Sequence, residues 1–386
     1  MLKNKFCCIL YVNRGETLKR RDKIKGTLFG GAIGDALGYQ IEFESYVKDR
    51  QVTGYKRNRG IISDDTQMTL FTANALLWRD TRFDLKGIAP RYSDAIYMGY
   101  LDWLETQIGR HNQMSVSWIK NIPELNKARE PGATCLSSLM SGKKGTIDEP
   151  LNYSKGCGAV MRIAPIAIYV DNPILAGNLA AESAALTHGH PSTNIAAFVC
   201  STLINILLNS NKSIEEALEE TLKLYKDNFD IFGVVQRDNF LQKVEEAKKL
   251  SKLKLKDTEA IKKLGEGWVS DEAFVIALYS CLKYQNSFKE TIICAVNHGG
   301  DSDSTGAIAG NIIGARLGYS QIPKYYIDNL ELKDVIEEIS NDLMNPLIGK
   351  EKDDKWLDKY LYLRNPIPEK GNAKVLNNRC KKDSLL

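Results

Sequence analysis

The sequence predicts an all-α fold, arranged as one compact multi-helix domain. Apolar residues recur at helical spacing along most of the chain, and neither the alternation of a half-buried strand nor a repeating strand–helix unit is found. No linker rich in proline, glycine or serine divides the 386 residues, and an apolar content of 43% is enough for a large core. We expect an N-terminal extension at 1–21, the helical domain at 22–345 and a partly disordered C-terminal segment at 346–386.

Two expected helices carry a glycine at every fourth position. The first ladder is Gly26, Gly30, Gly34 and Gly38, and the second is Gly306, Gly310, Gly314 and Gly318. Glycine inside a helix costs about 1 kcal/mol relative to alanine, so four in register imply the close approach of another backbone. Asp35, Asn311 and Arg316 interrupt the ladders, which favours tight packing in a soluble protein over a membrane dimer face. We expect both helices at the centre of the protein, against each other.

The other elements follow from the same periodicity. The first ladder helix covers 22–37, and a polar loop at 50–60 leads to a helix that Ser63 or Asp64 caps and that runs to about Trp78. A turn at 155–162 precedes an apolar helix that ends near Tyr169. Further helices are expected at 84–104, 129–142, 176–187, 194–208, 214–227, 239–250, 271–284, 288–295, 322–330 and 332–343.

Charge and cysteine usage exclude several classes of protein. The 52 basic and 48 acidic residues leave a net charge of only +4, which argues against a dedicated nucleic-acid binder. The eight cysteines show no CxxC spacing, which argues against a zinc site or a disulfide framework and favours a reducing, cytoplasmic setting. No apolar run reaches the roughly 18 residues that would suggest a membrane span. We therefore expect neither nucleic acid nor a membrane as partner.

Two clusters of oxygen-bearing side chains stand at predicted helix starts. Asp301, Asp303 and Ser304 open the second ladder helix, and Ser63, Asp64 and Asp65 open the helix near residue 64. Adjacent aspartates at one helix start are equally compatible with simple capping. Two such clusters together favour metal binding, because hard oxygens suit Mg²⁺ or Mn²⁺ and four carboxylates could hold two cations.

Two further motifs could bind a ligand, but ordinary structural roles also explain them. The turn at 156–161 could bind phosphate through backbone N–H groups, although an ordinary tight turn explains it equally well. His188 and His190 lie in one turn without a third soft ligand nearby for zinc, so His188 is expected to cap a helix or to hydrogen-bond a ligand. His298 is expected to shape the loop before Asp301.

Taken together, six segments resemble the ADP-ribosylglycohydrolases, the family of the dinitrogenase reductase-activating glycohydrolase and the ADP-ribosyl-acceptor hydrolases. They are residues 30–35, 63–66, 156–162, 187–188, 265–269 and 298–310, and the resemblance runs from about Lys25 to Gly318. It implies an all-α domain with a binuclear Mg²⁺ or Mn²⁺ centre in a cleft. It also implies hydrolysis of the glycosidic bond that joins C1″ of ADP-ribose to a protein side chain.

The resemblance implies roles for individual residues. The metal ligands would be Ser63, Asp64, Asp65, Asp301, Asp303 and Ser304. The ADP-ribose phosphates would bind at Gly156, Cys157, Gly158, Ala159, Val160 and Met161, with His188 at the nucleotide. Many relatives have asparagine where this chain has Cys157, so backbone contacts are expected there. Glu42 matches an acidic residue beside the metals, and Glu42 or Asp303 would be the general base.

The predicted activity is therefore removal of ADP-ribose from a modified protein, with arginine the favoured acceptor and a monomer the expected state. Acceptor choice is expected to depend on residues 102–129 and on the surroundings of Trp268. The alternatives are an ADP-ribose-binding or structural protein, as a lens crystallin of this family exemplifies, a hydrolase of a small ADP-ribose derivative, or an immunity protein against an ADP-ribosylating toxin. An oxygen ligand at every expected metal position favours the enzyme.

Overall fold

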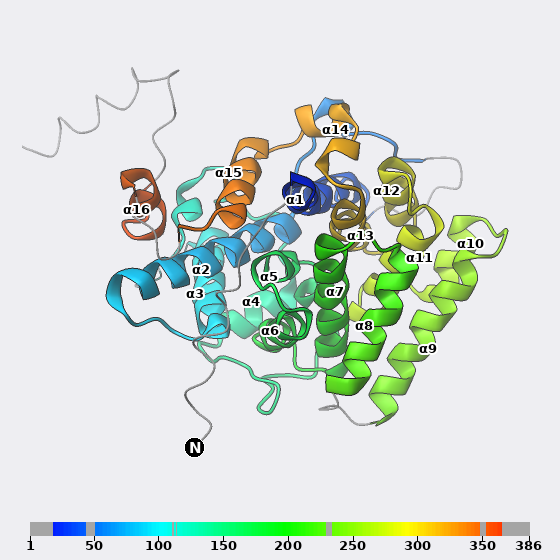
Figure 1. The fold of residues 1–386 in the computed structure, drawn as a ribbon, viewed down its shortest axis with the longest axis horizontal. Helices are drawn as coiled ribbons and strands as arrows, with labels where there is room; N and C mark the ends of the chain where they lie inside the picture. Colours follow the sequence, from blue (N-terminus) through cyan, green and yellow to red (C-terminus); the bar gives the residue numbers. More distant parts are fainter. Residues whose placement is uncertain are drawn as a thin grey trace, which may run out of the picture.

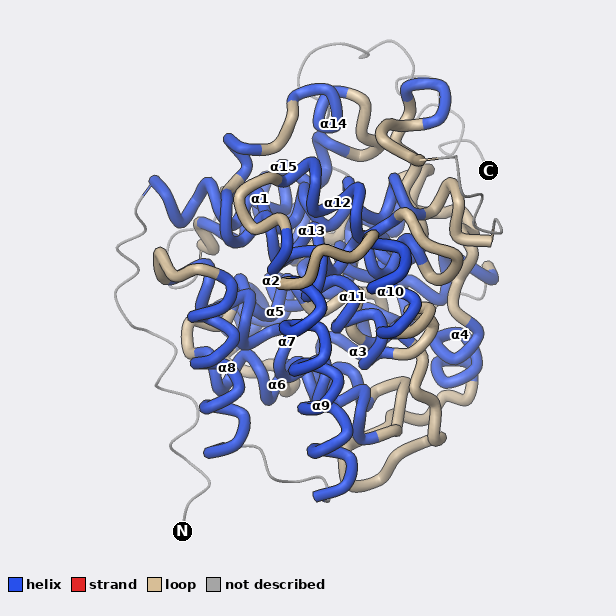
Figure 2. The backbone as a smooth tube through the Cα atoms, turned by 90° about the vertical axis from the view of Figure 1, so that its right-hand side faces the viewer, coloured by secondary structure: helices blue, strands red, loops and turns tan. Residues whose placement is uncertain are grey.

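In the computed structural model the chain folds almost entirely into helices (Figures 1 and 2). The structure describes residues 18–43, 51–109, 112, 114–228, 234–347 and 353–364. Within these ranges it has sixteen α-helices, four short 3₁₀ helices and two isolated β-bridges, with no longer strand. The predicted all-α fold is confirmed.

The two glycine ladders form the centre of the fold. Helix α1 (Leu18–Gly38) lies antiparallel to α13 (Ser302–Leu317). A Cβ atom added to Gly34 would lie 1.9 Å from the carbonyl oxygen of Gly306, and one added to Gly30 would lie 2.3 Å from that of Gly310. Only glycine permits so close an approach of two backbones, so the predicted contact between these helices is confirmed. The antiparallel pairing brings the end of α1 to the start of α13.

Helix α2 (Asp64–Lys86) extends beyond its predicted end near Trp78. The predicted start of the next helix, at residue 84, is wrong. Gly87, with φ of 70°, ends α2 in a left-handed C-cap, and its N–H donates to the carbonyl of Phe83 at 2.8 Å. Helix α3 (Tyr92–Ile108) begins after this break. The apolar periodicity continues across the break and therefore does not reveal it. In the sequence, Gly87 and Pro90 are the residues that indicate this boundary.

The other helices pack around this centre. They are α4 (Ala133–Met140), α5 (Ala164–Tyr169), α6 (Pro173–Ala185), α7 (Pro191–Asn209), α8 (Ile214–Asn228), α9 (Val234–Ser251), α10 (Asp257–Leu264), α11 (Ser270–Lys283), α12 (Phe288–Val296), α14 (Lys324–Asp328) and α15 (Lys333–Met344). Helix α7 contacts both α8 and α9, which Figure 1 shows toward one end of the molecule. A lysine-rich stretch, residues 248–263, covers the end of α9, the connection after it and most of α10.

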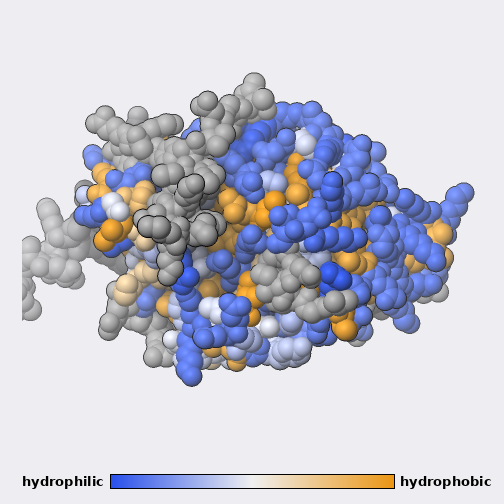
Figure 3. Space-filling model, turned by 60° about the horizontal axis from the view of Figure 1, so that its bottom comes forward, coloured by the Kyte–Doolittle hydropathy of each residue, from blue (hydrophilic) through white to orange (hydrophobic). Residues whose placement is uncertain are grey.

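Helix α7 tests the expectation about membranes. Among the described residues it is the one helix long and apolar enough to cross a bilayer. However, 94% of the most apolar part of this helix is buried inside the protein. The packing partners of α7 thus cover its apolar surface. The face drawn in Figure 3 is largely hydrophilic, with small separate apolar patches.

The C-terminal segment contributes a docked helix that the sequence did not suggest. Within the segment 346–386, helix α16 (Asp354–Tyr360) packs against α2, and the Nε1 of its buried Trp356 donates to Thr81 Oγ1 at 2.9 Å. Lys359 pairs with Asp342 and with Glu338 of α15. Residues 1–17 and 365–386, where an extension and a disordered tail were expected, lie outside the described residues.

Candidate metal centre

Two helix starts supply the side chains predicted to bind metal. At the start of α2, Ser63 is the N-cap and its Oγ accepts a hydrogen bond from the Asp65 N–H at 3.2 Å. At the start of α13, Asp301 is the N-cap and accepts from the Ser304 N–H at 3.1 Å. Helix N-termini carry partial positive charge, so both starts stabilise carboxylates. The six predicted ligands are all buried, namely Ser63, Asp64, Asp65, Asp301, Asp303 and Ser304.

Three carboxylates from two segments converge. One carboxylate oxygen from each of Glu42, Asp301 and Asp303 lies within 4.8 Å of the other two. Glu42 lies in the turn that follows α1, so the pairing of α1 with α13 accounts for this convergence. Among the described residues, this is the group of histidine, cysteine and acidic side chains that lie close enough together to hold an ion.

The electrostatics of the cluster fit a cation. Burial, reinforced by repulsion from neighbouring carboxylates, raises the pKa of Glu42 to about 10 and those of Asp64, Asp65 and Asp301 well above their usual range. Asp65 Oδ2 and Glu42 Oε2 are buried atoms without a hydrogen-bond partner. Unpaired oxygens among crowded carboxyl groups require protons or cations, and an all-oxygen carboxylate and hydroxyl set suits Mg²⁺ or Mn²⁺.

Asp35 belongs to this site, although the sequence analysis treated it only as an interruption of the glycine ladder. Its carboxylate accepts hydrogen bonds from the N–H of Ser63 at 3.0 Å, from the N–H of Thr66 at 3.1 Å and from the Thr66 hydroxyl. Burial and the charge of Asp303 raise its pKa to about 7. Asp35 therefore joins α1 to the start of α2 and orients the segment that carries Asp64 and Asp65. The signal that could have revealed it was a carboxylate on a fully buried helix.

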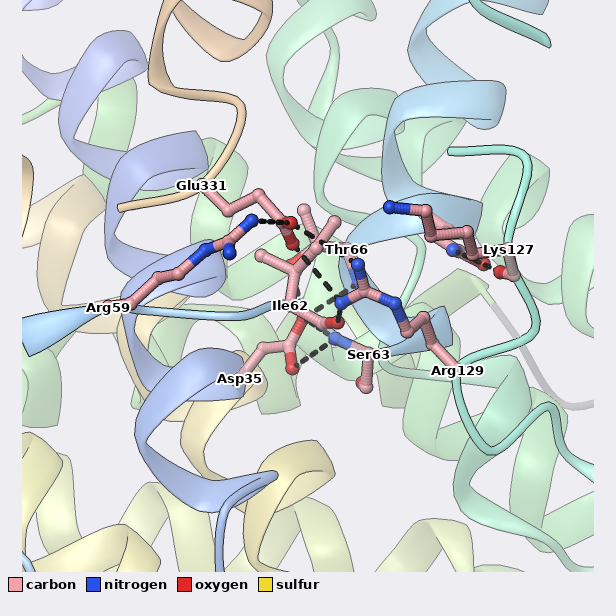
Figure 4. A network of polar contacts seen from close by, with 9 residues as sticks. Asp35, Arg59, Ile62, Ser63, Thr66, Lys127, Arg129 and Glu331 are labelled. Atoms are coloured by element: carbon pink, nitrogen blue, oxygen red, sulfur yellow. Dashed lines mark hydrogen bonds and ion pairs between the residues drawn. The ribbon is translucent and has the colours of Figure 1, made fainter. Parts of the chain in front are cut away.

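An ion pair behind α2, shown in Figure 4, holds the same segment from its other side. Arg129 pairs with Glu331 through both of its terminal nitrogens, at 3.1 Å and 3.2 Å. The same guanidinium donates to the carbonyl of Ile62 at 3.0 Å, and the Arg129 carbonyl accepts from the Asp64 N–H at 3.1 Å. Arg59 contacts Glu331 from the exposed side at 3.4 Å. These residues were not anticipated, because no local pattern links positions 129 and 331.

The loop that carries Arg129 also contacts a predicted metal ligand directly. The backbone N–H of Gly132, just before α4, donates to Asp64 Oδ2 at 3.1 Å. Gln67 of α2 donates to the carbonyl of Lys127 at 2.9 Å. The start of α2 is thus fixed by backbone and side-chain contacts from two distant loops, which fixes the direction of the Asp64 carboxylate.

The turn predicted to bind phosphate lies beside the cluster. Its residues 157–159 form a 3₁₀ helix, and the apolar helix expected here begins only at Ala164. Gly156 bridges to Val269, and the Cys157 N–H donates to the carbonyl of Trp268 at 3.2 Å. The Cys157 thiol donates to Asp301 Oδ2 at 2.6 Å, so the side chain of Cys157 contacts a predicted metal ligand.

The remaining residues of this turn divide into two groups. Gly156 and Cys157 are half-buried, whereas Gly158, Ala159, Val160 and Met161 are buried. Met161 contacts both helix starts, because its carbonyl accepts from Thr69 at 3.3 Å and its sulfur from the Ser304 hydroxyl at 3.8 Å. The turn is therefore packed onto the two helices that carry the carboxylates.

His188 lies behind the turn. A Cβ added to Gly156 would lie 3.0 Å from His188 Nε2, and Nδ1 hydrogen-bonds Thr187 Oγ1 at 2.8 Å. The buried Arg162, another residue not anticipated, donates to the same hydroxyl at 2.7 Å. Burial and the charge of Arg162 lower the pKa of His188 to about 3, so its imidazole is neutral.

The other two described histidines have local roles. His190 is the N-cap of α7, and its Nδ1 accepts from the Ser192 N–H at 3.0 Å. His298 Nε2 hydrogen-bonds Thr305 Oγ1 at 2.9 Å, and burial lowers its pKa to about 4. This contact ties the loop before Asp301 to α13.

Comparisons with known proteins identify the family of this chain. The sequence profile of the ADP-ribosylglycohydrolase family matches residues 16–353. A protein of Archaeoglobus fulgidus that carries no functional name is 31% identical, over 83% of this chain and 96% of its own. The ADP-ribosyl-[dinitrogen reductase] glycohydrolase of Rhodospirillum rubrum is 25% identical, over 81% and 91%. The ADP-ribosylarginine hydrolase Tri1 of Pseudomonas putida is 24% identical, over 84% and 78%.

The fold has a solved counterpart as well. A structure described as an ADP-ribosylglycohydrolase-related protein complex superposes with a TM-score of 0.58, covering 84% of this chain and 98% of its own at 22% identity. At that identity the likeness concerns the fold alone. The profile match spans nearly all of the described residues and includes both helix starts that carry the carboxylates. The chain therefore belongs to the ADP-ribosylglycohydrolase family.

Proposed function

We propose that this protein is a divalent-metal-dependent hydrolase that removes ADP-ribose from a modified side chain of another protein, with arginine as the acceptor. The observation that carries the proposal is the convergence of Glu42, Asp301 and Asp303 within 4.8 Å of one another. Membership of the family supports a hydrolase of ADP-ribosyl groups. The unpaired buried oxygens of Asp65 and Glu42 support a metal centre, which we propose to be two Mg²⁺ or Mn²⁺ ions.

The reaction sets clear chemical demands. Cleavage at C1″ of the ribose develops oxocarbenium character, and a water must be activated to attack it. Divalent cations held by Ser63, Asp64, Asp65, Asp301, Asp303 and Ser304 would orient the ribose hydroxyls and lower the pKa of that water. The half-buried backbone of Gly156 and Cys157 lies next to Asp301 and would hold the diphosphate.

Glu42 is the candidate general base. It lies at the edge of the cluster rather than at a helix start, and it is less buried than the aspartates. Beside bound cations its carboxylate would be ionised and able to take a proton from the attacking water. Asp303 is the alternative base, but its burial at the start of α13 suits it better to holding an ion.

The choice of arginine draws support from the relatives. The relative from Pseudomonas putida is an ADP-ribosylarginine hydrolase by name, and the relative from Rhodospirillum rubrum acts on ADP-ribosylated dinitrogen reductase. Proteins named ADP-ribosylhydrolase ARH3 match at similar identity, for example 23% for that of Gallus gallus. We also propose a cytoplasmic monomer that binds neither nucleic acid nor membranes. The near-balanced charge supports the absence of a nucleic-acid partner.

The deciding assay is release of ADP-ribose from arginine-linked and serine-linked substrates, with Mg²⁺, with Mn²⁺ and after chelation. We expect cation-dependent release that is faster from arginine. Stabilisation by ADP-ribose and Mg²⁺ without release from either substrate would instead identify a binding protein.

Two variants test the assigned roles. Asp303→Ala should abolish both cation binding, measured by calorimetry, and turnover, and retention of either contradicts its role as a ligand. Glu42→Gln should keep cation binding and lose turnover by about 100-fold, the usual contribution of a general base. Undiminished turnover with intact cation binding would assign the base to another residue.

A further inference from the structure

Two aromatic side chains stack on each other in an exposed position beside the carboxylate cluster. The rings of Phe43 and Trp268 lie 6.1 Å apart between centroids, with their planes inclined by 22°. Phe43 is 68% exposed and Trp268 is 40% exposed. The other four tryptophans, Trp78, Trp103, Trp118 and Trp356, are at most 8% exposed. An exposed pair of large rings is unusual in this protein, and such pairs often mark a binding site.

Each of the two residues is connected to the candidate metal centre through its backbone. Phe43 follows Glu42, whose carboxylate is part of the cluster. The carbonyl of Trp268 accepts from the Cys157 N–H at 3.2 Å, and the thiol of Cys157 reaches Asp301. Gly267 packs so closely that a Cβ there would lie 3.3 Å from the Asp301 carbonyl oxygen. The pair therefore borders the carboxylate cluster, at which the proposed function puts ribose C1″.

The geometry suits a flat cation. A planar group held between two rings needs their planes about 7 Å apart, twice the usual 3.5 Å contact between carbon atoms, so these rings, whose centroids lie 6.1 Å apart, would have to move apart to admit one. Guanidinium groups stack on tryptophan and phenylalanine through cation–π attraction. A serine acceptor offers neither a plane nor a charge.

We propose that Phe43 and Trp268 form the acceptor site, in which the guanidinium of an ADP-ribosylated arginine is held between the two rings. The proposal rests on the proposed function, because that function places ribose C1″ at the carboxylate cluster. It assigns the preference for arginine to these two side chains rather than to the cation ligands.

The test compares two substrates that differ only in the acceptor, ADP-ribosyl-arginine and ADP-ribosyl-serine. Phe43→Leu and Trp268→Leu should each lower kcat/KM for the arginine substrate about 10-fold, the scale of a desolvated cation–π contact. They should change kcat/KM for the serine substrate by less than about 2-fold. Phe43→Tyr and Trp268→Phe keep an aromatic face and should retain most of the activity on arginine. Tyr325→Leu removes another exposed ring, 42% exposed in α14, and should affect neither substrate.

The outcomes separate the possible occupants. Equal losses on both substrates, together with weaker inhibition by free ADP-ribose, would show that the rings bind the nucleotide and would overturn the proposal. No loss on either substrate would overturn it too. If the wild-type protein cleaves neither substrate, the proposed function fails, and the Kd values of the two uncleaved compounds then test the acceptor site directly. Trp268→Leu must weaken binding of the arginine compound alone, and a circular-dichroism melt of each variant establishes that it is folded.

Discussion

Replacing Gly34 by alanine should force apart the two central helices and weaken the candidate metal centre with them. The added methyl carbon would lie 1.9 Å from the carbonyl oxygen of Gly306 and 2.3 Å from its carbonyl carbon. Real contacts of this kind are not shorter than 3.0 Å, so the backbones must separate by roughly 1 Å. Both obstructing atoms belong to the backbone of α13, so no side-chain rotation can relieve the clash.

The magnitude follows from two opposing terms. Overpacking of this kind costs about 3 kcal/mol when the neighbours cannot rotate away. Alanine recovers about 1 kcal/mol, because it is the better helix former. We therefore expect the free energy of unfolding, measured by urea denaturation, to fall by about 2 kcal/mol. Gly306 lies one helical turn from Asp303, so a shift of this size exceeds the roughly 0.5 Å tolerance of a metal site and should weaken Mg²⁺ binding at least 10-fold.

Gly132→Ala provides the matched control for stability. Gly132 has φ of −55°, which alanine adopts freely, and the nearest atoms to its added methyl carbon lie at 3.8 Å and 3.9 Å. This variant should unfold within about 0.5 kcal/mol of the wild type. A Gly34→Ala protein as stable as the wild type, with unchanged Mg²⁺ affinity by calorimetry, would refute the argument that the glycine contact sets the geometry of the centre.

Three further predictions test other parts of the structure. Glu331→Gln removes the charged partner of the 12%-exposed Arg129, so it should cost about 3 kcal/mol of stability and about 10-fold in Mg²⁺ affinity. Arg59→Gln, at a 63%-exposed partner, should cost under about 1 kcal/mol, and equal costs would contradict this ranking. Because the pKa of His298 is lowered from 6.5 to about 4, between these values the unfolded chain binds a proton that the folded protein does not, and stability falls as pH falls. The unfolding free energy of the wild type relative to His298→Asn should thus decrease by about 2 kcal/mol between pH 7 and pH 5, and a constant difference would show that His298 titrates normally. Trp356→Ala should lower the unfolding free energy by about 3–5 kcal/mol, whereas a loss under 1 kcal/mol would show that α16 adds little to the domain.

In the proposed mechanism, aspartates that the sequence does not distinguish have different roles. Asp35 and Asp303 are both buried aspartates near the centre. The Asp35 carboxylate, however, already accepts hydrogen bonds from the N–H groups of Ser63 and Thr66. Asp65 keeps one oxygen without a partner. A carboxylate already saturated with hydrogen bonds orients its neighbours, whereas one with a free oxygen is available to an ion.

Helix content and the pairing of α1 with α13 were both evident from local patterns. Helical periodicity depends only on residues three and four positions apart, and each glycine ladder indicates a close neighbour within a stretch of thirteen residues. The ends of individual helices were harder to predict from the sequence. The break at Gly87 and the start of α5 at Ala164 depend on backbone conformations that apolar spacing does not record.

The amino-acid sequence by itself determined the helical class, the central helix pair and the oxygen-rich character of two helix starts, since each of these resides in a short stretch of chain. Only the tertiary structure decided which groups meet there. Glu42, the Arg129–Glu331 pair and the Phe43–Trp268 pair come from segments far apart in sequence, and nothing in their local surroundings specifies the partner. Their meeting depends on the antiparallel contact of α1 with α13, which the glycines allow and the packed core maintains.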